Sequence, residues 1–180
     1  MTGRPVDELL ARSNRLGADP TTTNYAGGNT SAKGTGTDPT SGTDPTSGTE
    51  VPLLWVKGSG GDLGTLTAGG LAALRLDRLR GLTAGYRGVE HEDEMVAALD
   101  FCLHGRGGAA PSIDTAMHGL LPAQHVDHLH PDAGIAFAAA ADGERLTREC
   151  FGDRVLWVPW RRPGFQLGLD IAAVAEANPQ

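Results

Sequence analysis

Apolar and polar positions follow two periods along this chain, and their order indicates the fold class. Residues 5–16 carry apolar side chains at helical spacing with two acidic residues in the first turn, which predicts an amphipathic helix. The compact apolar run 51–56 predicts a buried strand that leads into a glycine-rich loop. Similar patterns predict further helices at 67–80, 90–104, 112–121, 131–150 and 165–177, and strands at 29–33, 125–130 and 154–158. Because strands and helices alternate, we expect an α/β or α+β fold.

A polar segment interrupts this alternation. Residues 36–47 repeat Gly-Thr-Asp-Pro-Thr-Ser twice, and such a sequence buries too little apolar area to offset its ordering entropy. We therefore expect a low-complexity insertion over 34–49, forming a mobile hairpin tip. The remainder of the 180 residues, 18.7 kDa in all, fits one domain.

Charge and cysteine content narrow the function classes. The net charge of -7 disfavours nucleic acid as a partner, because the general field repels phosphate backbones. No apolar stretch approaches the roughly 20 residues that span a bilayer, and the N-terminus lacks an apolar signal core, so we expect a cytoplasmic protein without a membrane partner. The distant Cys102 and Cys150 predict ordinary buried thiols rather than a disulfide or a metal site.

Two of the six histidines have a spacing that suits a metal ion. His128 and His130 lie at i and i+2 of a predicted strand, so both side chains point to one face. Zinc binds neutral imidazole nitrogens and normally has three protein ligands in a catalytic site. The alternative is two partly exposed histidines at a strand end. His125 falls on the opposite face, which predicts a structural role.

Asp114 precedes this strand by 14 residues and begins a predicted helix. Its carboxylate could serve the metal as a ligand or as a proton-transfer group, or could be a helix N-terminal acid. His118 shares the helix face of Asp114 at i+4, and we expect a packed core histidine there.

Two glycine-rich loops offer donors for an anion. Residues 27–31 and 57–61 are rich in glycine and hydroxyl groups, the second follows a strand, and Lys57 adds a cation. Backbone N–H groups of such loops can hold phosphate oxygens, although the Rossmann and Walker spacings are absent and tight turns explain the glycines equally well. Ser112 adds a donor or caps the following helix, as Thr67 does for the helix expected at 67–80.

Four segments in order resemble the class II aldolase/adducin family, and the resemblance spans the chain apart from 34–49. It is nearest to the aldolase half of bifunctional rhamnulose-1-phosphate aldolase/lactaldehyde dehydrogenases. The segments are Asn24-Tyr25-Ala26-Gly27-Gly28-Asn29-Thr30-Ser31, Lys57-Gly58-Ser59-Gly60-Gly61-Asp62-Leu63, Pro111-Ser112-Ile113-Asp114-Thr115 and His125-Val126-Asp127-His128-Leu129-His130-Pro131-Asp132-Ala133.

The resemblance implies a three-layer α/β/α fold around a mainly antiparallel sheet, with zinc or another divalent metal. It implies reversible cleavage of a ketose 1-phosphate, of the rhamnulose 1-phosphate type, into dihydroxyacetone phosphate and an aldehyde. His128 and His130 would be metal ligands, and Asp114 stands where the family has a glutamate that transfers protons. The positions matching the family's phosphate site are Gly28, Asn29, Gly58, Ser59, Gly60 and Ser112. Family members are often tetramers, so we expect a homo-oligomer whose small-molecule partner is a sugar phosphate.

The chain also departs from the family. No histidine follows His130, where members carry a third histidine ligand, and the dehydrogenase half is missing. We therefore expect the N-terminal portion of the family domain, with an apolar sheet edge exposed at 154–158 that favours self-association. A truncated or non-catalytic adducin-like domain is the alternative to an active lyase, and a sugar-phosphate epimerase would share the metal chemistry.

Overall fold

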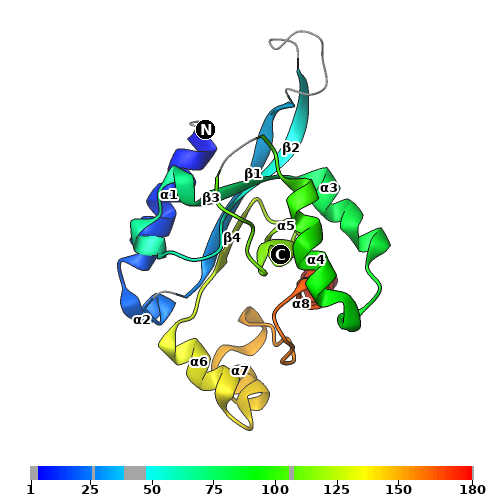
Figure 1. Ribbon diagram of the computed structural model, residues 1–180. Coiled ribbons are helices and arrows are strands. Elements are labelled where there is room, and N and C mark those ends of the chain that lie inside the picture. The colour runs from blue at the N-terminus through cyan, green and yellow to red at the C-terminus, as the bar shows by residue number, and fades with distance from the viewer. Residues whose placement is uncertain (1–3, 26, 39–47, 106–107, 180) are drawn as a thin grey trace.

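A four-stranded antiparallel sheet organises the computed structural model, which describes residues 4–25, 27–38, 48–105 and 108–179. The strand order is β3-β2-β1-β4, so β4 lies at one edge and β3 at the other (Figure 1). The strands are β1 (Asn29–Asp38), β2 (Thr49–Lys57), β3 (Leu71–Arg75) and β4 (His125–His128). Residues 34–38 of the expected insertion extend β1 and Thr49 begins β2, whereas 39–47 lie outside the described residues.

Helices cover both faces of the sheet. The α-helices are α1 (Arg4–Gly17), α2 (Pro20–Thr23), α3 (Leu76–Gly81), α4 (Glu92–Ala98), α5 (Thr115–Leu120), α6 (Asp132–Ala139), α7 (Gly143–Phe151) and α8 (Phe165–Ala177). Short 3-10 helices lie at Leu63–Thr65, Ala68–Gly70, Leu82–Gly85, Val89–His91, Leu99–Cys102 and Gly152–Arg154. Helix α1 lies on one side of the sheet, and α3 and α5 lie on the other (Figure 1). This arrangement confirms the expected three-layer α/β/α fold.

Strand β2 divides the apolar core because its side chains alternate between the two faces. Leu53 and Trp55 pack towards α1, in a cluster with Val6 and Leu9 of that helix. The other face of the sheet carries a second cluster, which reaches α3 and the 3-10 helix after α4; its buried members are Leu54, Val56, Ala72, Leu74, Leu76, Leu79, Leu99 and Cys102. The sheet is therefore buried on both faces. Cys102 is buried in this cluster as expected, whereas Cys150 of α7, expected to be buried too, is exposed because that helix lies outside the core.

The helix expected at 67–80 is wrong. Residues 71–75 form β3, and only Leu76–Gly81 is α-helical. Leu71 joins the core cluster on the α1 side, whereas Leu74 joins the opposite cluster. Consecutive leucines and alanines have high helix propensity, but a strand buried on both faces also has a continuous apolar sequence. Thr67 makes no side-chain cap bond, contrary to its expected role.

Two expectations for the C-terminal third need correction. The helix expected over 131–150 is two helices, α6 and α7, because the chain is extended at Ala140 and turns before Gly143. The strand and sheet edge expected at 154–158 are absent among the described residues, since no neighbouring strand pairs with that segment. Val155 and Leu156 are nevertheless exposed.

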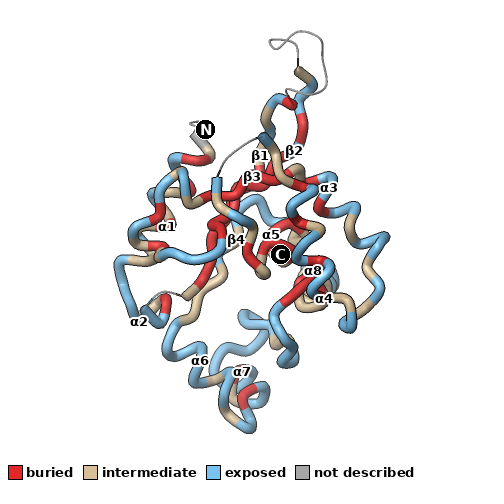
Figure 2. The backbone as a smooth tube through the Cα atoms, in the orientation of Figure 1, coloured by how far each residue is buried: buried red, intermediate tan, exposed pale blue. Residues whose placement is uncertain are grey.

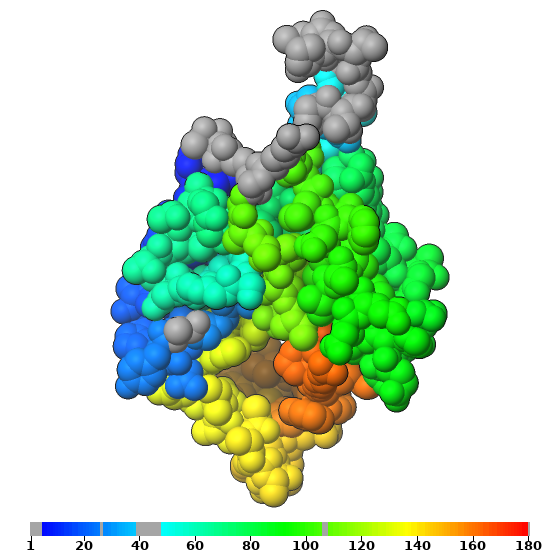
Figure 3. Space-filling view, in the orientation of Figure 1, coloured from blue at the N-terminus to red at the C-terminus, as the bar shows by residue number. Residues whose placement is uncertain are grey.

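Residues 131–163, which contain α6 and α7, extend away from the sheet and the core. Among them, all of which the structure describes, only Gly143 and Thr147 are buried. Figure 2 shows α6 and α7 as a largely exposed lobe below the sheet, and Figure 3 shows a hollow between this lobe and α8. The apolar helix α6 thus contributes nothing to the described core clusters.

A buried carboxylate fastens the last helix to the rest of the domain. Glu92 begins α4 and accepts hydrogen bonds from the backbone N–H groups of Phe165 (2.6 Å) and Gln166 (2.9 Å) in the first turn of α8. The hydroxyl of Tyr86 donates to the same carboxylate at 2.6 Å. Burial, reinforced by this bond, raises the pKa of Tyr86. A negative charge at a helix N-terminus is favourable, so Glu92 acts as a cap from a distant segment.

Candidate metal and anion site

The two histidines singled out by their spacing converge in space. Nε2 of His128 lies 3.0 Å from Nε2 of His130, and the ring centroids are 4.8 Å apart. The expected strand 125–130 is too long, because β1 begins at Asn29, opposite His128, and pairing ends there. His130 therefore lies just beyond β4. Two nitrogens bound to one tetrahedral ion at about 2.0–2.1 Å would lie roughly 3.4 Å apart, so the pair is close to the geometry of two zinc ligands.

A glycine makes room for this pair. A Cβ atom at Gly27 would lie 2.1 Å from Nδ1 of His130 and 2.8 Å from the carbonyl oxygen of Thr23. Any larger residue would have to displace the imidazole or the backbone of α2. Gly27 therefore lets the first glycine-rich loop lie directly against His130.

The second ring nitrogen of His128 faces a carboxylate. Nδ1 of His128 is buried without a hydrogen-bond partner, and Oδ2 of Asp114 lies 3.9 Å from it. Burial lowers the pKa of His128, while the Asp114 charge opposes that effect. A lowered pKa favours the neutral imidazole, which is the form that binds metal. Asp114 itself occupies the N-cap position of α5 without making a side-chain cap bond.

Two histidines and one nearby carboxylate do not make a complete site. Within the part of the chain that the structure describes, no group of three or more His, Cys, Asp or Glu side chains could hold a metal ion. The convergent nitrogens fit two ligand positions of a divalent ion, and any further ligand would have to come from outside these residues or from water.

The six residues expected to bind phosphate line one cavity of about 450 Å³. They come from the start of β1, the end of β2 and the segment before α5: Gly28, Asn29, Gly58, Ser59, Gly60 and Ser112. Asp114 lines the same cavity, and so does Val96 of α4, which sequence reasoning missed because an apolar helix residue gives no chemical signal. Their roles in binding stay predictions.

Hydrogen bonds within the protein already use some of the polar groups that line this cavity. Nδ2 of Asn29 donates to Oγ of Ser112 (3.2 Å) and to the carbonyl of Lys57 (3.3 Å), so Ser112 faces the cavity instead of capping α5. The backbone N–H groups of Gly58 and Ser59 already bind carbonyls of Gly70 and Ala110, both at 2.9 Å. Ser59 can therefore serve an anion through its hydroxyl rather than its N–H.

Lys57 gives the cavity a buried cation. Its Nζ donates to the carbonyl of Gly60 at 2.8 Å and lies 3.4 Å from that of Gly58, which ties the glycine loop to the end of β2. Burial lowers the pKa of Lys57, and the charges of Asp62 and Asp114 oppose that effect. The lysine thus stabilises the loop and faces the place where an anion would lie.

The other two histidines near the sheet have structural contacts. His118 is fully buried, and its Nδ1 lies 2.8 Å from Oγ of Ser31. Burial lowers the pKa of His118 to about 3, with smaller effects from His128 and Lys33. His125 points to the other face of β4, where its Nδ1 lies 3.1 Å from the guanidinium of Arg12.

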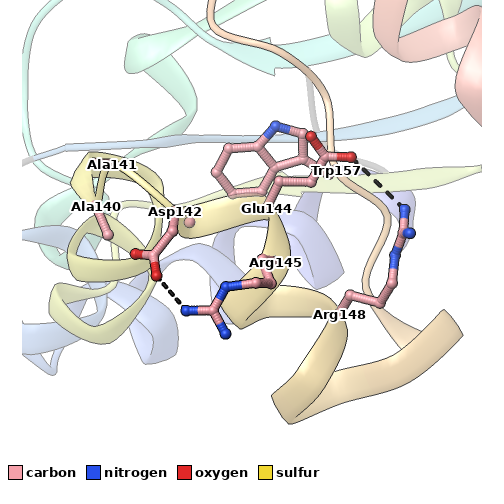
Figure 4. Close-up of a pocket in the computed structure, with 8 residues that line it drawn as sticks. Ala140, Ala141, Asp142, Glu144, Arg145, Arg148 and Trp157 are labelled. Atoms are coloured by element: carbon pink, nitrogen blue, oxygen red, sulfur yellow. Dashed lines mark hydrogen bonds and ion pairs between the residues drawn. The ribbon is translucent and has the colours of Figure 1, made fainter.

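A second cavity of about 510 Å³ opens at the start of α7 (Figure 4). Its guanidinium groups already have acidic partners: Arg145 pairs with Asp142, and Arg148 lies 3.7 Å from Glu144 beside the Trp157 ring. These charges satisfy each other, so this cavity offers less for a charged ligand than the glycine-lined one. No helix within the described residues is long and apolar enough to cross a bilayer.

Comparisons with known proteins agree with this architecture. A Bacillus subtilis protein named "Uncharacterized oxidoreductase YuxG" is 42% identical over 174 residues, which are 97% of this chain. The chain spans only 24% of that relative's length. The structure is similar to that of the N-terminal class II aldolase domain of a conserved protein from Thermoplasma acidophilum, with a TM-score of 0.82 and 27% identity over 97% of this chain and 76% of that one. Residues 8–179 match the profile of the class II aldolase and adducin N-terminal domain, and the chain therefore belongs to that family.

Proposed function

We propose that this domain is a metal-dependent lyase that cleaves a ketose 1-phosphate reversibly into dihydroxyacetone phosphate and an aldehyde. The observation that carries the proposal is the pair of facing imidazole nitrogens, 3.0 Å apart, next to a cavity lined by all six residues of the expected phosphate site. Rhamnulose 1-phosphate is the substrate type that the sequence resemblance favours.

Each part of the site has a task in this reaction. A divalent ion at His128 and His130 would supply a Lewis acid that stabilises negative charge as the carbon–carbon bond breaks. The hydroxyls of Ser59 and Ser112 and the cation of Lys57 would bind the phosphate and so orient the substrate. Asp114 lines this cavity and its Oδ2 lies 3.9 Å from Nδ1 of His128, so its carboxylate would be near both the metal ligand and a bound substrate.

The Bacillus subtilis protein, which is named as an oxidoreductase, is about four times as long as the region that matches this chain. The matched part has an aldolase-type fold, and we therefore propose lyase chemistry, and no hydride transfer, for these residues. We further propose that the domain assembles into homo-oligomers, which would cover apolar side chains such as Trp160 that are exposed here.

A non-catalytic, adducin-like role is the second candidate. It is favoured by the absence of a third protein ligand around His128 and His130 among the described residues. Such a domain would keep the anion cavity without binding metal.

Metal content decides between the two candidates. The protein is purified without chelators and analysed for metal, with the double variant His128→Ala/His130→Ala and the single variant His125→Ala as matched controls. We expect near-stoichiometric zinc in the wild type and in His125→Ala, and none in the double variant. Cleavage of ketose 1-phosphates is then measured on the loaded protein. A wild-type protein that takes up no metal even when zinc is added would refute the lyase and favour the adducin-like role.

A further inference from the structure

The Asp114 carboxylate lies near the ring nitrogen of His128 that does not face His130. An imidazole that binds metal through Nε2 presents Nδ1 on the other side of the ring, and that is the nitrogen nearest to the Asp114 carboxylate, at 3.9 Å. Nε2 of His128 meanwhile faces His130. The carboxylate therefore approaches the back of the ring relative to the place where both imidazoles meet.

The environment of Nδ1 calls for a partner. This atom is buried and has no hydrogen-bond partner within the described residues, although the side chains of His128 and Asp114 retain 26% and 22% of their exposure. A buried N–H without an acceptor destabilises the folded protein, so a carboxylate one small side-chain movement away is its natural acceptor. The backbone of Asp114 is fixed at the start of α5, which limits the carboxylate to this region.

Which nitrogen carries the proton determines whether the ring can bind metal. If Nδ1 is protonated and donates towards Asp114, the Nε2 lone pair is available. Histidines that bind metals usually donate their other N–H to a carboxylate, a carbonyl or water, and loss of that partner typically weakens metal binding 10- to 100-fold. In the metal-free protein, His130 would then donate its Nε2–H to Nε2 of His128, consistent with their 3.0 Å separation.

We propose that Asp114 is a positioning residue for His128: its carboxylate accepts the Nδ1–H bond and thereby holds the ring with Nε2 free for the metal. This rests on the proposed metal site at His128 and His130. It differs from the proton-transfer role that the family resemblance implies for this position. The aspartate side chain, one methylene shorter than glutamate, keeps the carboxylate beside the imidazole.

Two measurements test this role, and the first needs no metal. Nitrogen-15 NMR of the imidazole side chains in the metal-free protein, at a pH where His128 is neutral, reports which nitrogen is protonated. We expect Nδ1–H at His128 and Nε2–H at His130 in the wild type, and a mixture of tautomers at His128 in Asp114→Ala, which has no side-chain acceptor. Asp62→Asn is the matched control, because Asp62 also acts on Lys57 and its Oδ1 can still accept from Gly64 after the change.

The second measurement is the affinity for Co²⁺, followed by its visible absorption. We expect Asp114→Ala to bind 10- to 100-fold more weakly and Asp62→Asn to bind as the wild type does. Wild-type affinity in Asp114→Ala, or Nε2–H at His128 in the wild type, would overturn the positioning role while leaving the proposed function intact. A wild type that binds no metal but shows the Nδ1–H tautomer, lost in Asp114→Ala, would refute the lyase and still support the contact between Asp114 and His128.

Discussion

Removing the Glu92 carboxylate should detach α8 from the rest of the domain. The side chain is buried and accepts three hydrogen bonds, from the N–H groups of Phe165 and Gln166 and from the hydroxyl of Tyr86. In Glu92→Ala all three donors lose their acceptor, and a small cavity forms around them. The perturbation therefore combines lost charge-assisted bonds with donors left in a poorly hydrated place.

The magnitude follows from the number and type of bonds. A hydrogen bond to a charged group contributes about 1.5–3 kcal/mol, but the Gln166 N–H and the Tyr86 hydroxyl are only partly buried and can recover some hydration. We therefore expect Glu92→Ala to lower the free energy of unfolding by about 3–5 kcal/mol, which is large beside the 5–15 kcal/mol of a typical domain. Tyr86→Phe removes one bond and keeps the carboxylate, so its expected cost is about 1–2 kcal/mol. Glu92→Gln should fall between these two variants.

Urea denaturation followed by circular dichroism and tryptophan fluorescence gives the free energy of unfolding. The control is Asp93→Ala, next to Glu92, which removes an ion pair with Arg162 whose two side chains are 88% and 63% exposed. Exposed pairs of this kind contribute little, so the control should unfold almost as the wild type does. If Glu92→Ala were no less stable than Asp93→Ala, the buried carboxylate would not be what holds α8.

Further predictions concern the candidate site and the buried His118. Gly27→Ala should weaken Co²⁺ binding by displacing His130, whereas Gly85→Ala, where a Cβ meets nothing within 4 Å, should not; equal affinities in a titration would contradict the close approach. Burial keeps the pKa of His118 at about 3, below its ordinary value near 6.5, so below pH 6.5 the unfolded chain binds a proton at His118 that the folded chain does not bind. The free energy of unfolding should therefore fall by on the order of 4 kcal/mol as the pH drops from 6.5 towards 3. Urea denaturation at several pH values measures this loss, which should be smaller in His118→Gln. Lys57→Met should reduce the affinity for inorganic phosphate in isothermal titration calorimetry, because it removes the buried cation of the cavity, and unchanged affinity would place the anion elsewhere.

Sequence reasoning predicts the first and the last α-helix well. The 165–177 helix coincides with α8, and the pattern at 5–16 lies within α1. The segment 71–75 could not be identified in the same way, because a strand covered on both faces has no alternation and its leucines and alanines favour helix. The valines and leucine at 154–158 have strand propensity, but propensity without a neighbouring strand gives no ladder.

In the candidate site, too, some features can be predicted from the sequence and others depend on the tertiary structure. The spacing of His128 and His130 correctly predicts that they converge, although His130 lies beyond the strand on which that prediction rests. The glycine-rich segments meet at one cavity because each follows or precedes a strand of the same sheet. The approach of Asp114 to Nδ1 rather than to the metal side of His128 depends on where α5 lies, which no local pattern encodes. Likewise, the Ser59 N–H is not available to an anion because it donates to the carbonyl of Ala110, and this contact joins distant segments of the chain.

The exposed lobe of residues 131–163 affects how the histidine pair would respond to local opening. Almost none of its side chains belong to the core, so it can exchange its amide hydrogens through partial unfolding at a free energy well below that of the whole domain. His128 lies in the edge strand at the base of this lobe, and His130 lies just before α6. An ion shared by the two rings would join the sheet edge to the lobe and stabilise the closed state by mass action. Hydrogen exchange in α6 would then slow as the metal concentration rises, while exchange in β2 would stay the same.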